Sequence, residues 1–136
     1  MEIKSGLYIV TLNNEHPISV NAQDPRIADK AIKVTKQNCK FGKAKVLEGR
    51  RKNYYKTFGE ENVNYFPVVR MDDIEIAEKA VLAKLDDYRL RGRTGRKNEW
   101  LEGIEPNQIL TVVISTLEEL DVEYELLDEG ATLTMP

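Results

Sequence analysis

Residue types that act in phosphate chemistry occur at defined places in the first half of the chain. Gly6-Leu7-Tyr8 opens one apolar run, Lys40-Phe41-Gly42-Lys43 closes another, and Arg50 lies eight residues beyond Gly42. A phenol such as Tyr8 can relay a proton when a cation, here either lysine, lowers its pKa from about 10. The Arg50 guanidinium can hold two phosphate oxygens. These residue types favour hydrolysis of a phosphodiester, which needs an activated water and neutralised phosphoryl oxygens.

The elements that must position these residues are predicted from the apolar pattern. β-branched and aromatic residues predict three strands, at 7–12, 39–44 and 63–71, and Pro67 indicates an edge position for the third. Helical spacing of apolar residues predicts four helices, at 26–35, 46–58, 72–89 and 107–120. A short strand or arm follows at 122–127. We therefore expect an α+β fold with a small three-stranded, mixed or antiparallel sheet covered by helices, and a C-terminal helix and short strand.

Charge is distributed unevenly along the chain. Residues 104–136 contain eight acidic side chains and no Lys or Arg, so the rest of the chain holds 20 basic and 15 acidic groups. Ten basic residues lie between Lys30 and Lys56 against one acid, Glu48, and a second basic cluster runs from Arg89 to Lys97. A positive body with an acidic tail favours a polyanion as partner, although Lys-rich helix faces are often merely solvated.

Composition bounds the remaining possibilities. At 136 residues the chain is long enough for one core, and no apolar run approaches the roughly 20 residues that span a bilayer. The start of the sequence lacks the apolar stretch of a secretory signal, so we expect a cytoplasmic protein, in a bacterium or a phage-infected host, with no membrane partner. Cys39 is the only cysteine and His16 the only histidine, which argues against an intrachain disulfide or a structural zinc site.

The order of these motifs resembles the GIY-YIG nuclease superfamily, most closely its compact phage and bacterial branch. Gly6-Leu7-Tyr8 matches the first motif, Phe41-Gly42 ends the second, and Arg50 matches the arginine of the following helix. Glu78 matches a metal-binding glutamate on a later helix, and Glu99-Trp100-Leu101 resembles a string that follows that helix. The similarity covers residues 5–103. It implies a nuclease domain at 1–103 with an insert at about 13–38, and an acidic extension of the same domain at 104–136.

The resemblance also implies an activity. We expect a magnesium-dependent DNA endonuclease, with one Mg²⁺ ion on Glu78, replaceable by Mn²⁺, and with Tyr8, Arg50, Lys40 and Lys43 as catalytic residues. The alternative is an inactive nucleic-acid-binding or protein-interaction module on the same scaffold. Two departures from the family pattern favour that alternative, since Lys40 replaces the tyrosine of the second motif and Leu82 stands where this branch often has histidine.

We expect double-stranded DNA as the partner. Phosphate contacts are expected from basic residues of the insert, the first half of the chain and the later basic cluster, namely Lys33, Lys36, Arg51, Lys52, Arg91, Arg93, Arg96 and Lys97. The C-terminal helix could mediate a homodimer, or the acidic tail could cover the basic surface.

Simpler interpretations of the same residues stay open. Tyr8 could be an ordinary core tyrosine, and Glu78 a surface glutamate in a helix salt bridge. Arg50 is preferred to Arg51 on spacing alone. Trp100 is expected to anchor the core rather than stack on a base.

Overall fold

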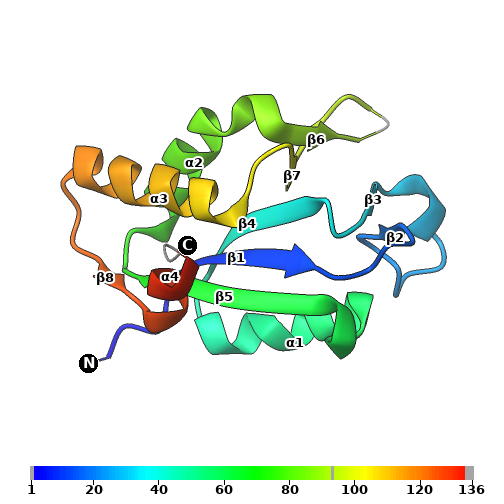
Figure 1. Cartoon of the computed structure of the whole chain (residues 1–136), viewed down its shortest axis with the longest axis horizontal. Coiled ribbons are helices and arrows are strands. Elements are labelled where there is room, and N and C mark those ends of the chain that lie inside the picture. Colours follow the sequence, from blue (N-terminus) through cyan, green and yellow to red (C-terminus); the bar gives the residue numbers. More distant parts are fainter. Residues whose placement is uncertain (1, 93, 134–136) are drawn as a thin grey trace.

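The computed structural model describes residues 2–92 and 94–133. It is an α+β fold with a six-stranded antiparallel sheet in the order β6-β7-β4-β1-β5-β8 and a separate two-stranded sheet, β2-β3 (Figure 1). The strands are β1 (Gly6–Leu12), β2 (Ile18–Ser19), β3 (Lys33–Val34), β4 (Asn38–Ala44), β5 (Val63–Arg70), β6 (Arg89–Arg91), β7 (Lys97–Glu102) and β8 (Glu125–Leu126). The α-helices are α1 (Leu47–Phe58), α2 (Ile74–Lys84), α3 (Pro106–Leu120) and α4 (Asp128–Leu133), with short 3₁₀ turns at Ala28–Lys30, Glu60–Asn62 and Asp86–Tyr88.

The large sheet separates two hydrophobic clusters. Helix α1 covers one face, and α2 and α3 cover the other (Figure 1). Because successive strand residues point to opposite faces, Leu7 and Ile9 of β1 join the cluster under α2 and α3, whereas Tyr8 and Val10 join the cluster under α1. Trp100 is buried in the α1 cluster, edge-on to Phe58, as expected of a core anchor.

The prediction of a three-stranded sheet was wrong. The three predicted strands form the centre of the sheet as β4-β1-β5, and the sheet is extended by β6 and β7 on one side and by β8 on the other. The added strands are short or polar, such as Arg89–Arg91 and Glu125–Leu126, and they do not show a clean alternation of apolar and polar residues. The pattern that identifies a half-buried strand is therefore missing from them.

The predicted helix at 26–35 was also wrong. The segment between β1 and β4, residues 13–37, is here called the insert, and it forms a hairpin-like excursion in which Ile18 pairs with Val34 and Ser19 with Lys33. Only Ala28–Lys30 is helical, as a single 3₁₀ turn. The β-branched residues Ile32 and Val34 favour the extended conformation that the second half of the segment adopts.

Two irregularities of the sheet determine the surroundings of Tyr8. The β1 to β5 register shifts between Leu7, opposite Val69, and Tyr8, opposite Pro67, so β5 carries one extra residue there. Bulges of this kind bend a strand and redirect side chains. In addition, β7 pairs with β4 only along Asn38–Lys40.

The C-terminal segment is part of the same packed fold. Helix α3 begins with Pro106 at its first turn and a reciprocal capping box between Glu105 and Gln108, and its apolar face (Ile109, Val113, Leu117) is buried in the cluster that includes α2. That face is therefore used within the chain. The division at residue 103 and the homodimer stay predictions. None of the helices in the described part of the chain has the length and apolar content needed to cross a bilayer.

Candidate active site at the open edge of strand β4

The edge of β4 beyond Lys40 is open. In the part of the chain that the structure describes, no strand pairs with residues 41–44 on the side away from β1. Helices α1 and α2, on opposite faces of the sheet, both approach this edge. Together they line a cleft of about 390 Å³, to which α1 contributes residues including Arg50 and α2 contributes residues including Glu75. We call it the β4 cleft. An open edge lets groups from both faces meet.

Tyr8 lies across Gly42 at this edge. A Cβ atom added to Gly42 would lie 2.5 Å from the Cζ and hydroxyl oxygen of Tyr8, so only glycine leaves room for the phenol. The Tyr8 hydroxyl is 2.6 Å from the hydroxyl of Tyr54 on α1, and the two rings meet edge to face. A third ring, Tyr65, lies beside both and donates its hydroxyl hydrogen to the Leu47 carbonyl oxygen, 2.6 Å away. The packing fixes the Tyr8 and Tyr54 hydroxyls as a pair.

Charged groups from three other elements act on Tyr8. Burial raises the pKa of the Tyr8 phenol, and the negative charges of Glu78 and Glu99 raise it further. The hydrogen bond with Tyr54 and the positive charge of Arg50 act in the opposite direction and lower the pKa. Arg50 comes from α1, Glu78 from α2 and Glu99 from β7. Burial likewise raises the pKa of Tyr54. Both phenols are therefore neutral at ordinary pH, and the cation that acts on Tyr8 is Arg50 rather than Lys40 or Lys43.

Lys40 lies on the α1 face of the sheet. Its Nζ is 5.3 Å from the centre of the Tyr54 ring, within the range of a cation–π contact. Burial lowers the pKa of the Lys40 ammonium, although Glu99 opposes the shift. The lysine is thus next to the tyrosine pair through its contact with Tyr54.

Lys43 and Glu78 form an ion pair at the same edge. The Lys43 Nζ lies 2.8 Å from Oε1 of Glu78 and 3.1 Å from Oε2 of Glu75, one turn earlier on α2. The Glu78 side chain is only 14% exposed and that of Glu75 is 71% exposed. The hydrogen bond to Glu78 raises the pKa of Lys43. Glu78 is therefore the inward carboxylate of the pair and Glu75 the outward one.

Arg50 contributes to the lining of two hollows. It lines the β4 cleft and also a second hollow of about 340 Å³, here called the groove. The groove also contains Lys40, Tyr54 and Glu99. Arg51 lines neither hollow, and its guanidinium lies 5.0 Å from the centre of the Tyr65 ring. The choice of Arg50 over Arg51 stays a prediction.

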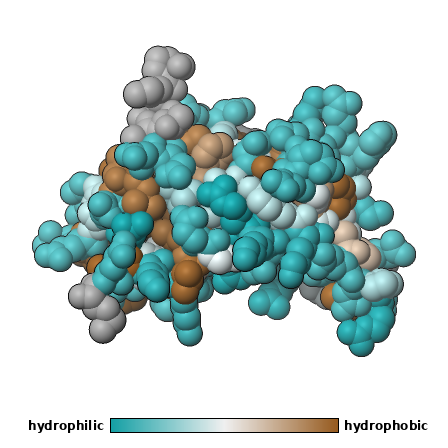
Figure 2. Space-filling view, turned by 90° about the horizontal axis from the view of Figure 1, so that it is seen from below, coloured by the Kyte–Doolittle hydropathy of each residue, from teal (hydrophilic) through white to brown (hydrophobic). Residues whose placement is uncertain are grey.

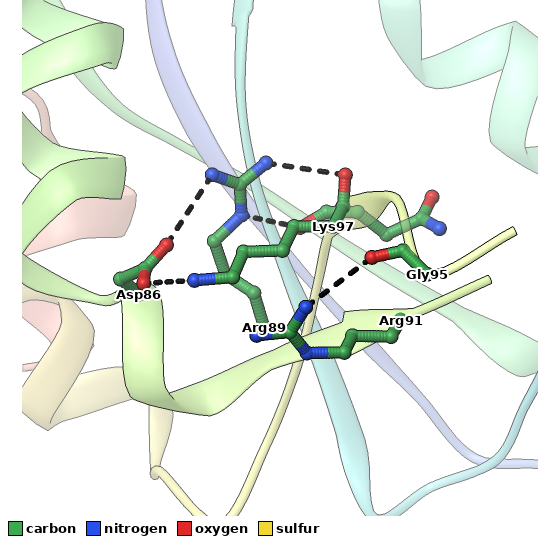
Figure 3. Close-up of polar contacts among 6 residues, drawn as sticks. Asp86, Arg89, Arg91, Gly95 and Lys97 are labelled. Carbon is green, nitrogen blue, oxygen red and sulfur yellow. Dashed lines mark hydrogen bonds and ion pairs between the residues drawn. The ribbon is translucent and has the colours of Figure 1, made fainter.

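The predicted phosphate-binding residues are spread around this centre. Lys33 and Lys52 are exposed, and Lys36 is exposed and paired with Glu15 at 3.1 Å. In the β6–β7 hairpin Arg91 and Arg96 are exposed, while Lys97 pairs with Asp86, which also lies near Arg89 (Figure 3). Arg93 lies outside the described residues. The face of the molecule that carries α1 is mainly hydrophilic, with hydrophobic residues gathered toward the end that holds the N-terminus and β8 (Figure 2).

The donor set around Glu78 is compatible with only a sparse metal site. Within the described residues no group of three or more His, Cys, Asp or Glu side chains is assembled that could hold a metal ion. Mg²⁺ commonly uses one or two carboxylates and completes its shell with water and substrate phosphate. Glu78 could supply one such carboxylate if its pairing with Lys43 opened.

Three residues at or beside the candidate site, Tyr54, Asn53 and Glu99, were not predicted as site residues from the sequence. Tyr54 lies four residues after Arg50, which places both on one face of α1, and this spacing was available in the sequence. Asn53 lines both hollows with Arg50. Glu99 reaches the site only because β7 pairs with β4, and the sequence carries no clear signal for that strand.

Comparison with protein families gives a match over most of the chain. The model of the T5orf172 domain family matches residues 23–117. The comparisons with curated proteins and with solved structures found no significant match. The assignment to the GIY-YIG superfamily, made from the motif order, is corrected by the family match. That match is consistent with a nucleic-acid-related domain and does not by itself indicate magnesium-dependent cleavage.

Proposed function

Since the chain belongs to the T5orf172 domain family, we propose that it is a magnesium-dependent DNA endonuclease that hydrolyses phosphodiester bonds at the open edge of β4. The observation that carries the proposal is the hydrogen-bonded pair of Tyr8 and Tyr54, on whose Tyr8 phenol the charges of Arg50 from α1 and Glu78 from α2 act. These groups are distant in sequence, and the fold brings Arg50 to the β4 cleft and both Arg50 and Tyr54 to the groove.

Arg50 holds the scissile phosphate in this proposal. Its exposed guanidinium lies where the two hollows meet, so a strand in either one passes it. A planar fork of donors suits two non-bridging oxygens, and charge placed in advance at those oxygens stabilises the transition state. Lys40 adds a second positive group on the groove side.

The tyrosine pair moves the proton of the attacking water. The water oxygen forms a bond to phosphorus as the bond to the leaving oxygen breaks, and the water must lose a proton. Tyr8 accepts this proton while giving its own to Tyr54, whose proton passes to water in the groove that Tyr54 lines. A relay of this kind needs no phenolate, which agrees with the raised pKa of both phenols.

Glu78 is the residue that would hold Mg²⁺. A single carboxylate with substrate oxygens and waters is a usual donor set for this ion. Bound there, the ion would supply charge neutralisation on the phosphate and a water that can protonate the leaving oxygen. Lys43 would release Glu78 when the ion binds and would remain paired with Glu75.

A second candidate function is a non-cleaving nucleic-acid or protein interaction module. The Lys43–Glu78 ion pair favours it, because the pair already satisfies the carboxylate that a metal would need. Such a module would bind without metal-dependent cleavage.

The test is incubation of the purified protein with supercoiled plasmid and Mg²⁺. We expect nicking by the wild type and a loss on the order of 100-fold for Arg50→Ala, because a phosphate-stabilising donor is removed. Lys56→Ala is the matched control, since Lys56 is an exposed cation of the same helix that lines neither hollow. Equal rates for all three proteins, or no nicking by the wild type, would overturn the proposal.

A further inference from the structure

The groove beside Tyr54 continues into a third hollow. This hollow, of about 370 Å³, shares Val20, Asn21 and Asn98 with the groove. It extends from these residues to Lys30 on one side and Arg96 on the other. The two hollows together form one path, here called the extended groove, that starts at Arg50.

Both walls of the extended groove are held in place. One wall is the insert, in which Ser19 donates a hydrogen bond to the Ala28 carbonyl oxygen and Gln23 donates one to the Lys56 carbonyl oxygen of α1. The other wall is the β6–β7 hairpin. At the base of this hairpin Asp86 forms an ion pair with Lys97, and its Oδ1 lies 3.9 Å from Nη1 of Arg89 (Figure 3).

The lining has positively charged residues at both ends. Lys40 and Arg50 lie at the end near Tyr8, and Lys30 and Arg96 lie at the far end. Asn21 and Asn98 lie where the two hollows join, Asn53 lies on the Arg50 side, and the carboxylate of Glu99, whose charge acts on Lys40, also lines that side. Lys30 and Arg96 are exposed, and neither has an ion-pair partner among residues 2–92 and 94–133.

We propose that the extended groove binds the backbone of one nucleic-acid strand and leads it from Arg50 to phosphate contacts at Lys30 and Arg96. Cations at both ends match phosphates, and neutral amides between them can bond to sugars and bases, which carry donors and acceptors but no charge. The inference rests on the proposed function for the identity of the polymer. It adds the insert, through Lys30, to the binding surface.

The test measures binding without cleavage. Fluorescence anisotropy of a labelled DNA duplex is recorded in EDTA for the wild type, Lys30→Glu and Arg96→Glu over a range of salt concentrations. We expect each substitution to weaken binding about tenfold at low salt and to reduce the slope of log K against log salt by about one, as for one lost phosphate contact. Thermal melting verifies folding, which substitution of exposed side chains should preserve.

Lys79→Glu is the matched control, with the same charge change at an exposed position of α2 that lines none of these hollows. We expect its affinity to change less than twofold. Equal losses of DNA affinity in all three variants would mean that binding depends on the overall charge of the protein rather than on the groove, and would overturn the inference. So would unchanged binding by the groove variants, or displacement of DNA by poly-glutamate at equal charge concentration.

The outcomes for the groove and for catalysis are separable. If the wild type nicks plasmid but Lys30→Glu and Arg96→Glu bind normally, the groove assignment fails and the endonuclease stands. If the wild type does not nick but these variants lose binding selectively, the endonuclease fails and the groove stands.

Discussion

The hydroxyl oxygens of Tyr8 and Tyr54 lie 2.6 Å apart, although the residues are 46 positions apart in the sequence and belong to a strand and a helix. The hydroxyl pair is buried among packed rings, and Tyr54 also lines the groove. This connection gives the buried Tyr8 phenol a route to solvent.

Tyr54→Phe tests that connection. The variant keeps the ring and its packing but removes the hydroxyl that receives the Tyr8 proton. We expect the nicking rate under single-turnover conditions to fall on the order of 100-fold, and DNA affinity to stay unchanged. Loss of the buried hydrogen bond should cost about 1 kcal/mol in the free energy of unfolding. A wild-type nicking rate in Tyr54→Phe would rule out the relay.

Gly42→Ala tests the contact between Gly42 and Tyr8. The new methyl would lie 2.5 Å from the phenol, so the Tyr8 ring or the strand must move. We expect a loss of about 1 to 3 kcal/mol in the free energy of unfolding, measured by urea denaturation, together with loss of nicking. Gly49→Ala is the control for stability, because its methyl would approach only Val46, at 3.9 Å, within a helix. That variant should be as stable as the wild type or more so by up to about 1 kcal/mol.

Lys43→Met tests whether the ion pair competes with metal. The change removes the partner of Glu78 and a positive charge beside it. We expect the Mg²⁺ concentration for half-maximal nicking to fall about fivefold, equivalent to about 1 kcal/mol for a partly exposed pair. A higher Mg²⁺ requirement in this variant would instead assign Lys43 a direct role at the phosphate.

The buried phenols predict a stability loss at high pH. Burial raises the pKa of Tyr8, Tyr54 and Tyr65 above the ordinary value of about 10 for a tyrosine. Above about pH 10 the unfolded chain loses phenol protons that the folded chain keeps. The stability that these phenols contribute is therefore fully present below that pH and decreases as the pH rises further. Urea denaturation from about pH 8 to pH 11 should show the fall, and Tyr54→Phe should make it shallower.

The sequence predicted the centre of the fold well. Strands at 7–12, 39–44 and 63–71 correspond to β1, β4 and β5, and helices at 46–58 and 107–120 correspond to α1 and α3, because apolar or aromatic residues recur in these segments at strand or helix spacing. The short strand or arm predicted at 122–127 contains β8, whereas β6 and β7 were missed because pairing with a neighbour, rather than their own side chains, makes them strands. The insert was misread because helical spacing of a few apolar residues competed with β-branched residues that pair across it.

The candidate site was predictable in part. Tyr8, Arg50 and Glu78 were selected from the sequence, and the structure places them close enough for the two charges to act on the pKa of Tyr8. The pairing of Lys43 with Glu78 depends on how α2 approaches the β4 edge. The contribution of Glu99 depends on the register of β7. No local spacing in the sequence reports either of these tertiary relationships.

The most direct test of the central claim compares Glu78→Gln with Glu75→Gln. Both changes remove a carboxylate that pairs with Lys43, but only Glu78 acts on Tyr8. Single-turnover nicking with Mg²⁺ and DNA binding without it are measured for both variants. If Glu78 acts in cleavage, Glu78→Gln should lose nicking by on the order of 100-fold and keep its affinity for DNA, while Glu75→Gln should resemble the wild type. Wild-type nicking by Glu78→Gln, or equal losses in the two variants, would contradict that role of Glu78.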